Sequence, residues 1–122
     1  NKTRSPFNVS YPAQIAGLAA LQDDAFVAHA RAHNIQWRQW TRDEVRKLGL
    51  EVPESVCNFV LVRFPQRPGR SAEDADQFLK SKGIIVRRMA AYGLDDCLRI
   101  TIGQEDEMRA VVGALKEFLE QT

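Results

Sequence analysis

The pattern of hydrophobic and polar residues divides the chain into a helical first part and a mixed remainder. Residues 11–48 are rich in helix formers, and their large side chains recur at intervals of three and four, the spacing of one helix face. Ser10 can cap this segment and Gly49 can end it. The sequence "TRDE", residues 41–44, matches a capping box, so the pattern allows either one long helix or a second helix that restarts there. The stripe consists of Phe26, Ala30, His33, Trp37 and Trp40.

Short β-like runs follow. Residues 56–64, "VCNFVLVRF", form a nearly continuous run of β formers, which is typical of a strand covered on at least one face. The runs at 84–87 and 97–102 predict two more strands. They can pair as an antiparallel hairpin across a loop at 88–96.

One further helix is predicted between the first and second of these strands, and another after the third. Ser71 with Asp74 forms a capping box, and Gly83 ends the helix that it begins. Apolar residues at helical spacing predict a last helix near 105–119. The chain therefore predicts an α+β fold, in which long helices precede an antiparallel or mixed sheet of three or four strands with helices on one face. The expected core contains Phe59, Leu61, Phe78, Leu79, Ile100, Val111, Val112 and Leu115.

Size and charge narrow the class of protein. A length of 122 residues fits one compact domain. A net charge of +1 gives no electrostatic reason to expect a nucleic-acid or membrane partner. No apolar run approaches a bilayer span, and the first ten residues lack the apolar core of a signal peptide. We therefore expect a cytoplasmic protein in which Cys57 and Cys97, both in predicted strands, are buried reduced thiols.

Two arginines at the edges of apolar strands are the candidate functional residues. Arg99 lies on the strand face opposite Leu98 and Ile100, so the core does not need it. It can point into water, paired with Asp95 or Asp96. Alternatively, it binds an anion, because a guanidinium fork grips carboxylate or phosphate with two hydrogen bonds. Arg87 ends the neighbouring predicted strand, so both arginines can converge on one anion.

Other candidate chemistry is weaker. His29 and His33 lie four residues apart, but no third ligand accompanies them, so we expect a helix-surface pair rather than a metal site. The sequence has no Gly-rich phosphate loop and no nucleophile elbow. Nothing around Lys2, Lys47, Lys80, Lys82 and Lys116 marks a cofactor lysine.

Three segments resemble the histidinol-phosphate aminotransferase family of fold-type-I pyridoxal-phosphate transaminases. The sequence "GIIVRRMAAYGLDDCLRITIG", residues 83–103, with the helix after it, resembles the C-terminal end of the family. "RSPFNVSYPAQIAGLAAL", residues 4–21, resembles the segment between the large and small domains, and "NFVLVRF", residues 58–64, resembles the first long strand of the small domain. The resemblance implies a C-terminal fragment, with a connecting helical segment at 1–50 and a small α+β domain at 51–122. In such a fragment the long N-terminal helix lacks the large domain on which it packs, so we expect its Phe26, Trp37 and Trp40 side chains to be exposed.

The resemblance also implies a function for the two arginines. The family transfers an amino group between an imidazole amino-alcohol phosphate and glutamate, in histidine biosynthesis. The arginine of its "LRITIG" motif, here Arg99, grips the phosphate or carboxylate of the substrate, and the arginine that ends "IIVR", here Arg87, contributes. The family often has proline after the latter arginine, where this chain has Arg88. Either arginine can then face the substrate, and the strand register favours Arg87.

The same resemblance assigns the remaining parts of the enzyme to the upstream chain. The family's cofactor lysine and the other groups that hold pyridoxal phosphate have no matching position here. We therefore expect no catalytic, cofactor-binding or metal residue in this chain, and no activity from it alone. The full-length protein is expected to bind pyridoxal phosphate as a homodimer. The alternatives are a sister aromatic amino-acid transaminase, a threonine-phosphate decarboxylase, or an autonomous anion-binding α+β module.

Overall fold

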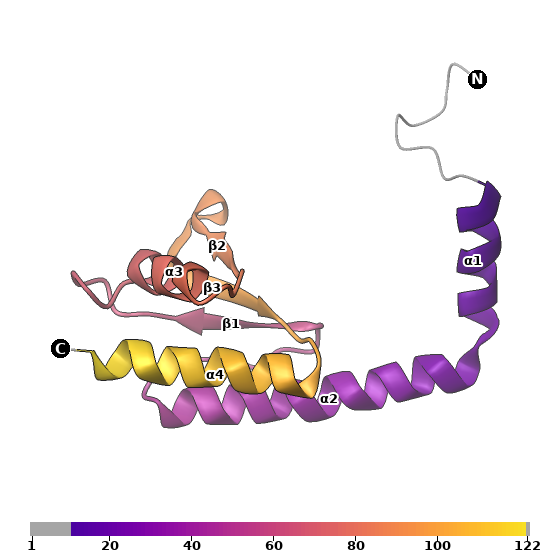
Figure 1. The fold of residues 1–122 in the computed structure, drawn as a ribbon, viewed down its shortest axis with the longest axis horizontal. Coiled ribbons are helices and arrows are strands. Elements are labelled where there is room, and N and C mark those ends of the chain that lie inside the picture. The colour runs from indigo at the N-terminus through magenta and orange to yellow at the C-terminus, as the bar shows by residue number, and fades with distance from the viewer. Residues whose placement is uncertain (1–10, 122) are drawn as a thin grey trace, which may run out of the picture. The chain divides into compact units, whose positions relative to one another are not determined.

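The computed structural model describes residues 11–121, so the expected cap at Ser10 lies outside the described residues. It confirms the α+β class. The elements are α1 (Tyr11–Gln22), α2 (Asp24–Lys47), β1 (Phe59–Arg63), α3 (Ala72–Ser81), β2 (Arg87–Met89), the 3-10 helix η1 (Ala90–Tyr92), β3 (Leu94–Thr101) and α4 (Glu105–Glu120) (Figure 1). None of the described helices is long and apolar enough to cross a membrane.

The chain divides into two compact units, residues 1–33 and 34–122, with the boundary inside α2. The described part of the first unit contains α1 and the beginning of α2. The helix break falls at Asp23, whose side-chain Oδ1 accepts a hydrogen bond of 2.9 Å from the backbone N–H of Phe26. Of the two alternatives at Thr41, the structure shows a continuous helix, because α2 runs through that residue without a restart. Large side chains of this unit are exposed: Ile15, Leu18, Leu21, Phe26 and Val27.

The second unit contains a three-stranded antiparallel sheet in the order β1-β3-β2. The predicted hairpin of the last two strands is confirmed, but its first strand is Arg87–Met89 rather than 84–87. Residues 84–86, which precede this strand, contact α3 and the core instead. The backbone N–H of Ile84 donates to the carbonyl of Leu79 at the end of α3, while Ile84 and Val86 pack against the core. Their apolar character therefore reflects packing without strand pairing.

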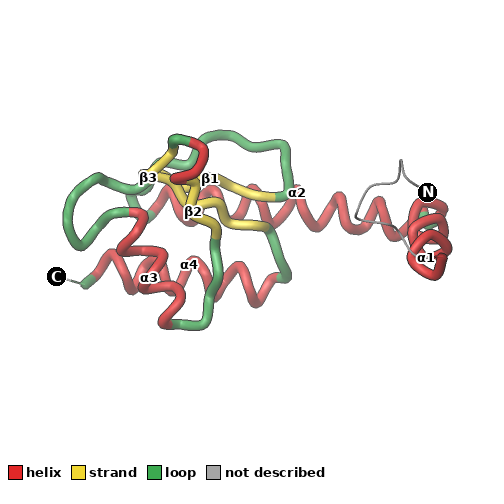
Figure 2. The backbone as a smooth tube through the Cα atoms, turned by 90° about the horizontal axis from the view of Figure 1, so that it is seen from above, coloured by secondary structure: helices red, strands yellow, loops and turns green. Residues whose placement is uncertain are grey.

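All three helices of this unit contribute to one core on one face of the sheet. Val60, Val62, Leu98 and Ile100 point to this face and are at most 1% exposed. They pack against residues of α2, α3 and α4, and Figure 2 shows the strands as one layer beside α3 and α4. The helix partners that are fully or largely buried include Trp37, Val45, Ala75, Leu79, Met108, Val111, Ala114, Leu115 and Phe118.

The predicted core is right for the helices and β3 and wrong for β1. Leu79, Ile100, Val111 and Leu115 are buried as expected, and Phe78 and Val112 are partly buried against the core. Phe59 and Leu61 instead alternate with the buried valines of β1 and lie half-buried on the opposite face. A run that is apolar at every position does not indicate which alternate set faces the helices.

The tryptophans of α2 were expected to be exposed with Phe26, and the structure contradicts this. Trp37 is 7% exposed and Trp40 is partly buried against the core. Arg109 of α4 lies 5.4 Å from the Trp37 ring centroid and 5.1 Å from that of Trp40, within the range of a cation–π contact. The second half of α2 thus packs against α4.

Local sequence signals within α3 are confirmed. Ser71 and Asp74 form the predicted capping box, and Gly83 follows the helix with a φ of 78°. Hydrogen bonds from Ser71 to the Asp74 carboxylate lower the pKa of that group. The cysteine prediction is half right: Cys97 is buried in β3, and burial raises the pKa of its thiol, whereas Cys57 is exposed before β1. Both thiols are free.

Candidate anion-binding site

The register of the hairpin brings the two predicted arginines together. Arg87 of β2 lies directly opposite Arg99 of β3, whereas Arg88 lies opposite Leu98. Directly opposed residues of an antiparallel pair share a sheet face. Arg87 and Arg99 therefore share the face without helices, and Arg88 turns toward α3, where it pairs with Glu73 at 3.5 Å. The strand register thus places Arg87, and not Arg88, beside Arg99.

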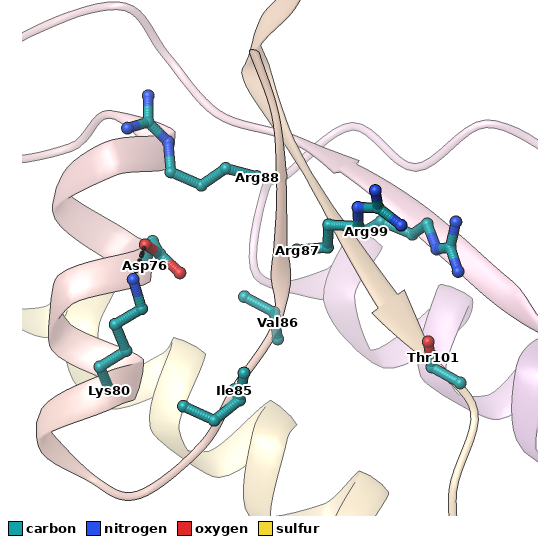
Figure 3. A pocket seen from close by; sticks show the side chains of 8 residues that line it. All are labelled: Asp76, Lys80, Ile85, Val86, Arg87, Arg88, Arg99 and Thr101. Carbon is teal, nitrogen blue, oxygen red and sulfur yellow. Dashed lines mark ion pairs between the residues drawn. The ribbon is translucent and has the colours of Figure 1, made fainter. Parts of the chain in front are cut away.

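An open pocket of about 460 Å³ surrounds this edge of the sheet. In Figure 3, Arg87 and Arg99 point to one side of β2, while Arg88, Asp76 and Lys80 lie on the other. The pocket is lined by Asp76, Lys80, Ile85, Val86, Arg87, Arg88, Arg99 and Thr101. The pocket is therefore an open surface depression beside β2, with several cationic side chains in its lining, rather than an enclosed cavity.

Aromatic side chains, and not carboxylates, accompany the two arginines. The guanidinium carbon of Arg99 lies 4.6 Å from the centroid of the Phe59 ring. That of Arg87 lies 5.8 Å from the Tyr92 ring, and Arg87 Nη2 donates to the Tyr92 hydroxyl at 3.5 Å. Within residues 11–121, neither arginine forms an ion pair.

Two acidic residues near the site, Asp96 and Asp76, form ion pairs with other basic residues. Asp96, one of the expected partners of Arg99, pairs with Arg63 at 3.2 Å. Asp76 is 3% exposed and pairs with Lys80 at 2.9 Å on the α3 side of β2. The arginine pair therefore keeps its two charges uncompensated by the described residues. Two like charges placed directly opposite each other destabilise a sheet.

The sequence predicted the arginines but missed Phe59 and Tyr92 as their neighbours. Phe59 was assigned to the core, and Tyr92 to a loop. Alternation within β3 is enough to place Arg99 on the open face. The ring contacts, in contrast, depend on how β1 and η1 are aligned with β2 and β3, which one strand alone does not reveal.

The other candidate ligands do not gather into a site. Among the described residues, no group of three His, Cys, Asp or Glu side chains can hold a metal. His29 lies on the surface of α2. Three lysines form ion pairs: Lys47 with Glu44 at 2.6 Å, Lys80 with Asp76 at 2.9 Å, and Lys82 with Glu117 at 2.9 Å.

Comparisons with known proteins relate the chain to aminotransferases. The sequence profile of the family described as "Aminotransferase class I and II" matches residues 1–115. The chain is 56% identical over 119 residues to the histidinol-phosphate aminotransferase of Paramagnetospirillum magneticum, covering 98% of this chain and 33% of that protein. It is 50% identical over 121 residues to that of Rhodopseudomonas palustris, covering 99% and 33%.

A solved structure supports the same relationship. The chain is similar to the histidinol-phosphate aminotransferase of Clostridium acetobutylicum, with a TM-score of 0.83 and 26% identity, covering 97% of this chain and 36% of that one. The chain thus spans about a third of the length of the curated relatives that it matches.

Proposed function

Because the chain belongs to the class I and II aminotransferase family, we propose that the full-length protein is a pyridoxal-phosphate-dependent histidinol-phosphate aminotransferase of histidine biosynthesis. It transfers an amino group between an imidazole amino-alcohol phosphate and glutamate, as a cytoplasmic homodimer. The high identity to relatives of that name favours this function over an aromatic transaminase, a threonine-phosphate decarboxylase or an autonomous module.

In this proposal the chain supplies the binding site for the anionic end of both substrates. Residues 1–50 connect the large domain to the small domain, and residues 51–122 form the small domain. The observation that carries the assignment is the direct opposition of Arg87 and Arg99 on the open face, without an acidic partner in the described residues. Arginine serves both substrates, because its planar fork matches phosphate and carboxylate alike.

The cofactor chemistry is assigned to the rest of the protein. Pyridoxal phosphate supplies the electron sink when bound. A lysine that attaches it covalently must react as a neutral amine, whereas the amines of Lys47, Lys80 and Lys82 are held in ion pairs with carboxylates. For Lys47, the hydrogen bond with Glu44 raises the pKa of the amine. These lysines do not fit the cofactor, so we derive no reaction step from them.

The test is steady-state kinetics of the full-length enzyme with Arg99→Ala and Arg99→Lys, varying the phosphate substrate and glutamate in turn. A charge-assisted hydrogen bond contributes roughly 1.5–3 kcal/mol, so Arg99→Ala should lower kcat/KM about ten- to hundredfold for both substrates. Arg99→Lys should lose less, because it keeps the charge and loses the two-pronged geometry.

The control is Arg67→Ala, which removes an arginine from the exposed loop before α3 and should leave the kinetics unchanged. Normal kinetics for both substrates in a folded Arg99→Ala enzyme would return Arg99 to the role of a solvated surface residue. A loss for one substrate only would contradict the shared site.

A further inference from the structure

The ring of Phe59 lies against the guanidinium of Arg99, although the two residues are on different strands. Phe59 is opposite Thr101 in the ladder, and Leu61 is opposite Arg99. The Phe59 ring therefore reaches diagonally across the sheet to contact Arg99 at 4.6 Å. Cross-strand diagonal neighbours on one face are within reach of aromatic side chains.

The backbone of Phe59 is fixed on both sides. Its carbonyl accepts a hydrogen bond of 2.7 Å from the Ser55 hydroxyl, and the carbonyl of the preceding Asn58 accepts one of 2.8 Å from the Ile102 N–H. Phe59 is also half-buried on the face that the helices leave open. The ring thus has a defined place, yet it is not part of the core beneath the helices.

We propose that Phe59 is a positioning residue that holds the Arg99 guanidinium in the orientation in which it binds the substrate anion. The inference rests on the proposed function of Arg99. A long arginine side chain that is free to rotate loses rotamer entropy when it binds. A ring packed on one face of the guanidinium restricts that freedom before the substrate arrives.

A ring does this without competing for the anion. The N–H donors of a guanidinium radiate in its plane, and its flat face is available for stacking. A carboxylate in the same place would occupy the donors and cancel the charge. Phe59 places a ring face, and no acceptor oxygen, beside the Arg99 guanidinium and leaves its charge intact.

Tyr92 provides an internal comparison. It lies farther from its arginine, at 5.8 Å, and is 63% exposed. Cation–π attraction weakens with distance and with exposure to water. Phe59 therefore restrains Arg99 more strongly than Tyr92 restrains Arg87, and we assign the positioning role to Phe59 alone.

The test compares Phe59→Leu, Phe59→Tyr and Phe59→Trp in the full-length enzyme. Phe59→Leu keeps an apolar side chain but removes the ring, and should raise KM for both substrates about three- to tenfold with kcat nearly unchanged. Phe59→Tyr and Phe59→Trp keep a ring face, so KM should stay near the wild-type value. The matched control is Phe78→Leu, because Phe78 carries a Lys82 contact at 5.5 Å on the helical side and its loss should lower stability without changing KM.

A double variant separates positioning from a general structural role. In the Arg99→Ala background, Phe59→Leu should have no further effect on KM, because the residue it positions is gone. An unchanged KM in a folded Phe59→Leu enzyme, or an equal further loss in the Arg99→Ala background, would overturn the proposal. If Arg99→Ala leaves the kinetics unchanged, the proposed function of Arg99 is contradicted. If Arg99→Ala raises KM and Phe59→Leu leaves KM unchanged, only the positioning role of Phe59 is contradicted.

Discussion

The two faces of the sheet are built from alternate residues of the same strands, and their chemistry is opposite. On one face, Val60 and Val62 of β1 meet Leu98 and Ile100 of β3 under three helices. On the other face, Phe59 and Leu61 lie beside Arg99, and Arg87 completes the row from β2.

The difference separates what stabilises this fold from what we assign to function. The covered face excludes water from aliphatic side chains, which is the dominant favourable term in folding. The open face opposes two cations, which is unfavourable in an isolated sheet. A fold that keeps such a pair on its open face carries a local cost, and anion binding is the use we propose for it.

The largest expected effect distinguishes two leucines on opposite faces. Leu98→Ala empties a fully buried position and should lower the free energy of unfolding by about 2–5 kcal/mol. Leu61→Ala, a matched truncation of a half-buried residue on the open face, should lower it by about 1 kcal/mol. Urea denaturation of the 122-residue chain measures both values. Equal losses would show that the open face contributes to the core as much as the covered face does.

A smaller effect of the opposite sign is expected from the arginine pair. Arg87→Thr removes one of the two opposed charges and introduces a β-forming residue, so it should raise the free energy of unfolding by about 0.2–1 kcal/mol. The gain should shrink at 1 M salt, where the screening length falls to about 3 Å.

Arg67→Thr is the control for the arginine pair, because it changes a loop arginine in the same way and should leave stability unchanged at both salt concentrations. A lower stability of Arg87→Thr at low salt would mean that Arg87 stabilises the folded chain. The two arginines would then impose no cost on the sheet.

Local signals in the sequence predicted the helices of the second unit well. The capping box of Ser71 and Asp74 and the helical repeat of α4 are contained within a few residues, so no knowledge of distant contacts is needed. The break at Asp23 was missed because its signal is a single side-chain cap in an otherwise continuous helical composition.

Which residues of a strand face the helices could be predicted from the sequence for β3 but not for β1. The faces of β3 were predicted because its residues alternate between apolar and polar, and this also placed Arg99 on the open face. The faces of β1 were not, because every position there is apolar until Arg63. The contact between Phe59 and Arg99 depends on the register between β1 and β3, which only the folded sheet defines.

The most direct measurement of the central claim is a crystal structure of the full-length enzyme with the phosphate substrate bound. We predict that guanidinium nitrogens of Arg99 lie within about 2.7–2.9 Å of oxygens of the substrate anion, the distance of a charge-assisted hydrogen bond. Arg87 should approach the same group from β2, and the Phe59 ring should remain in contact with the Arg99 guanidinium. A substrate anion held by other residues, with Arg99 turned into solvent, would contradict the account.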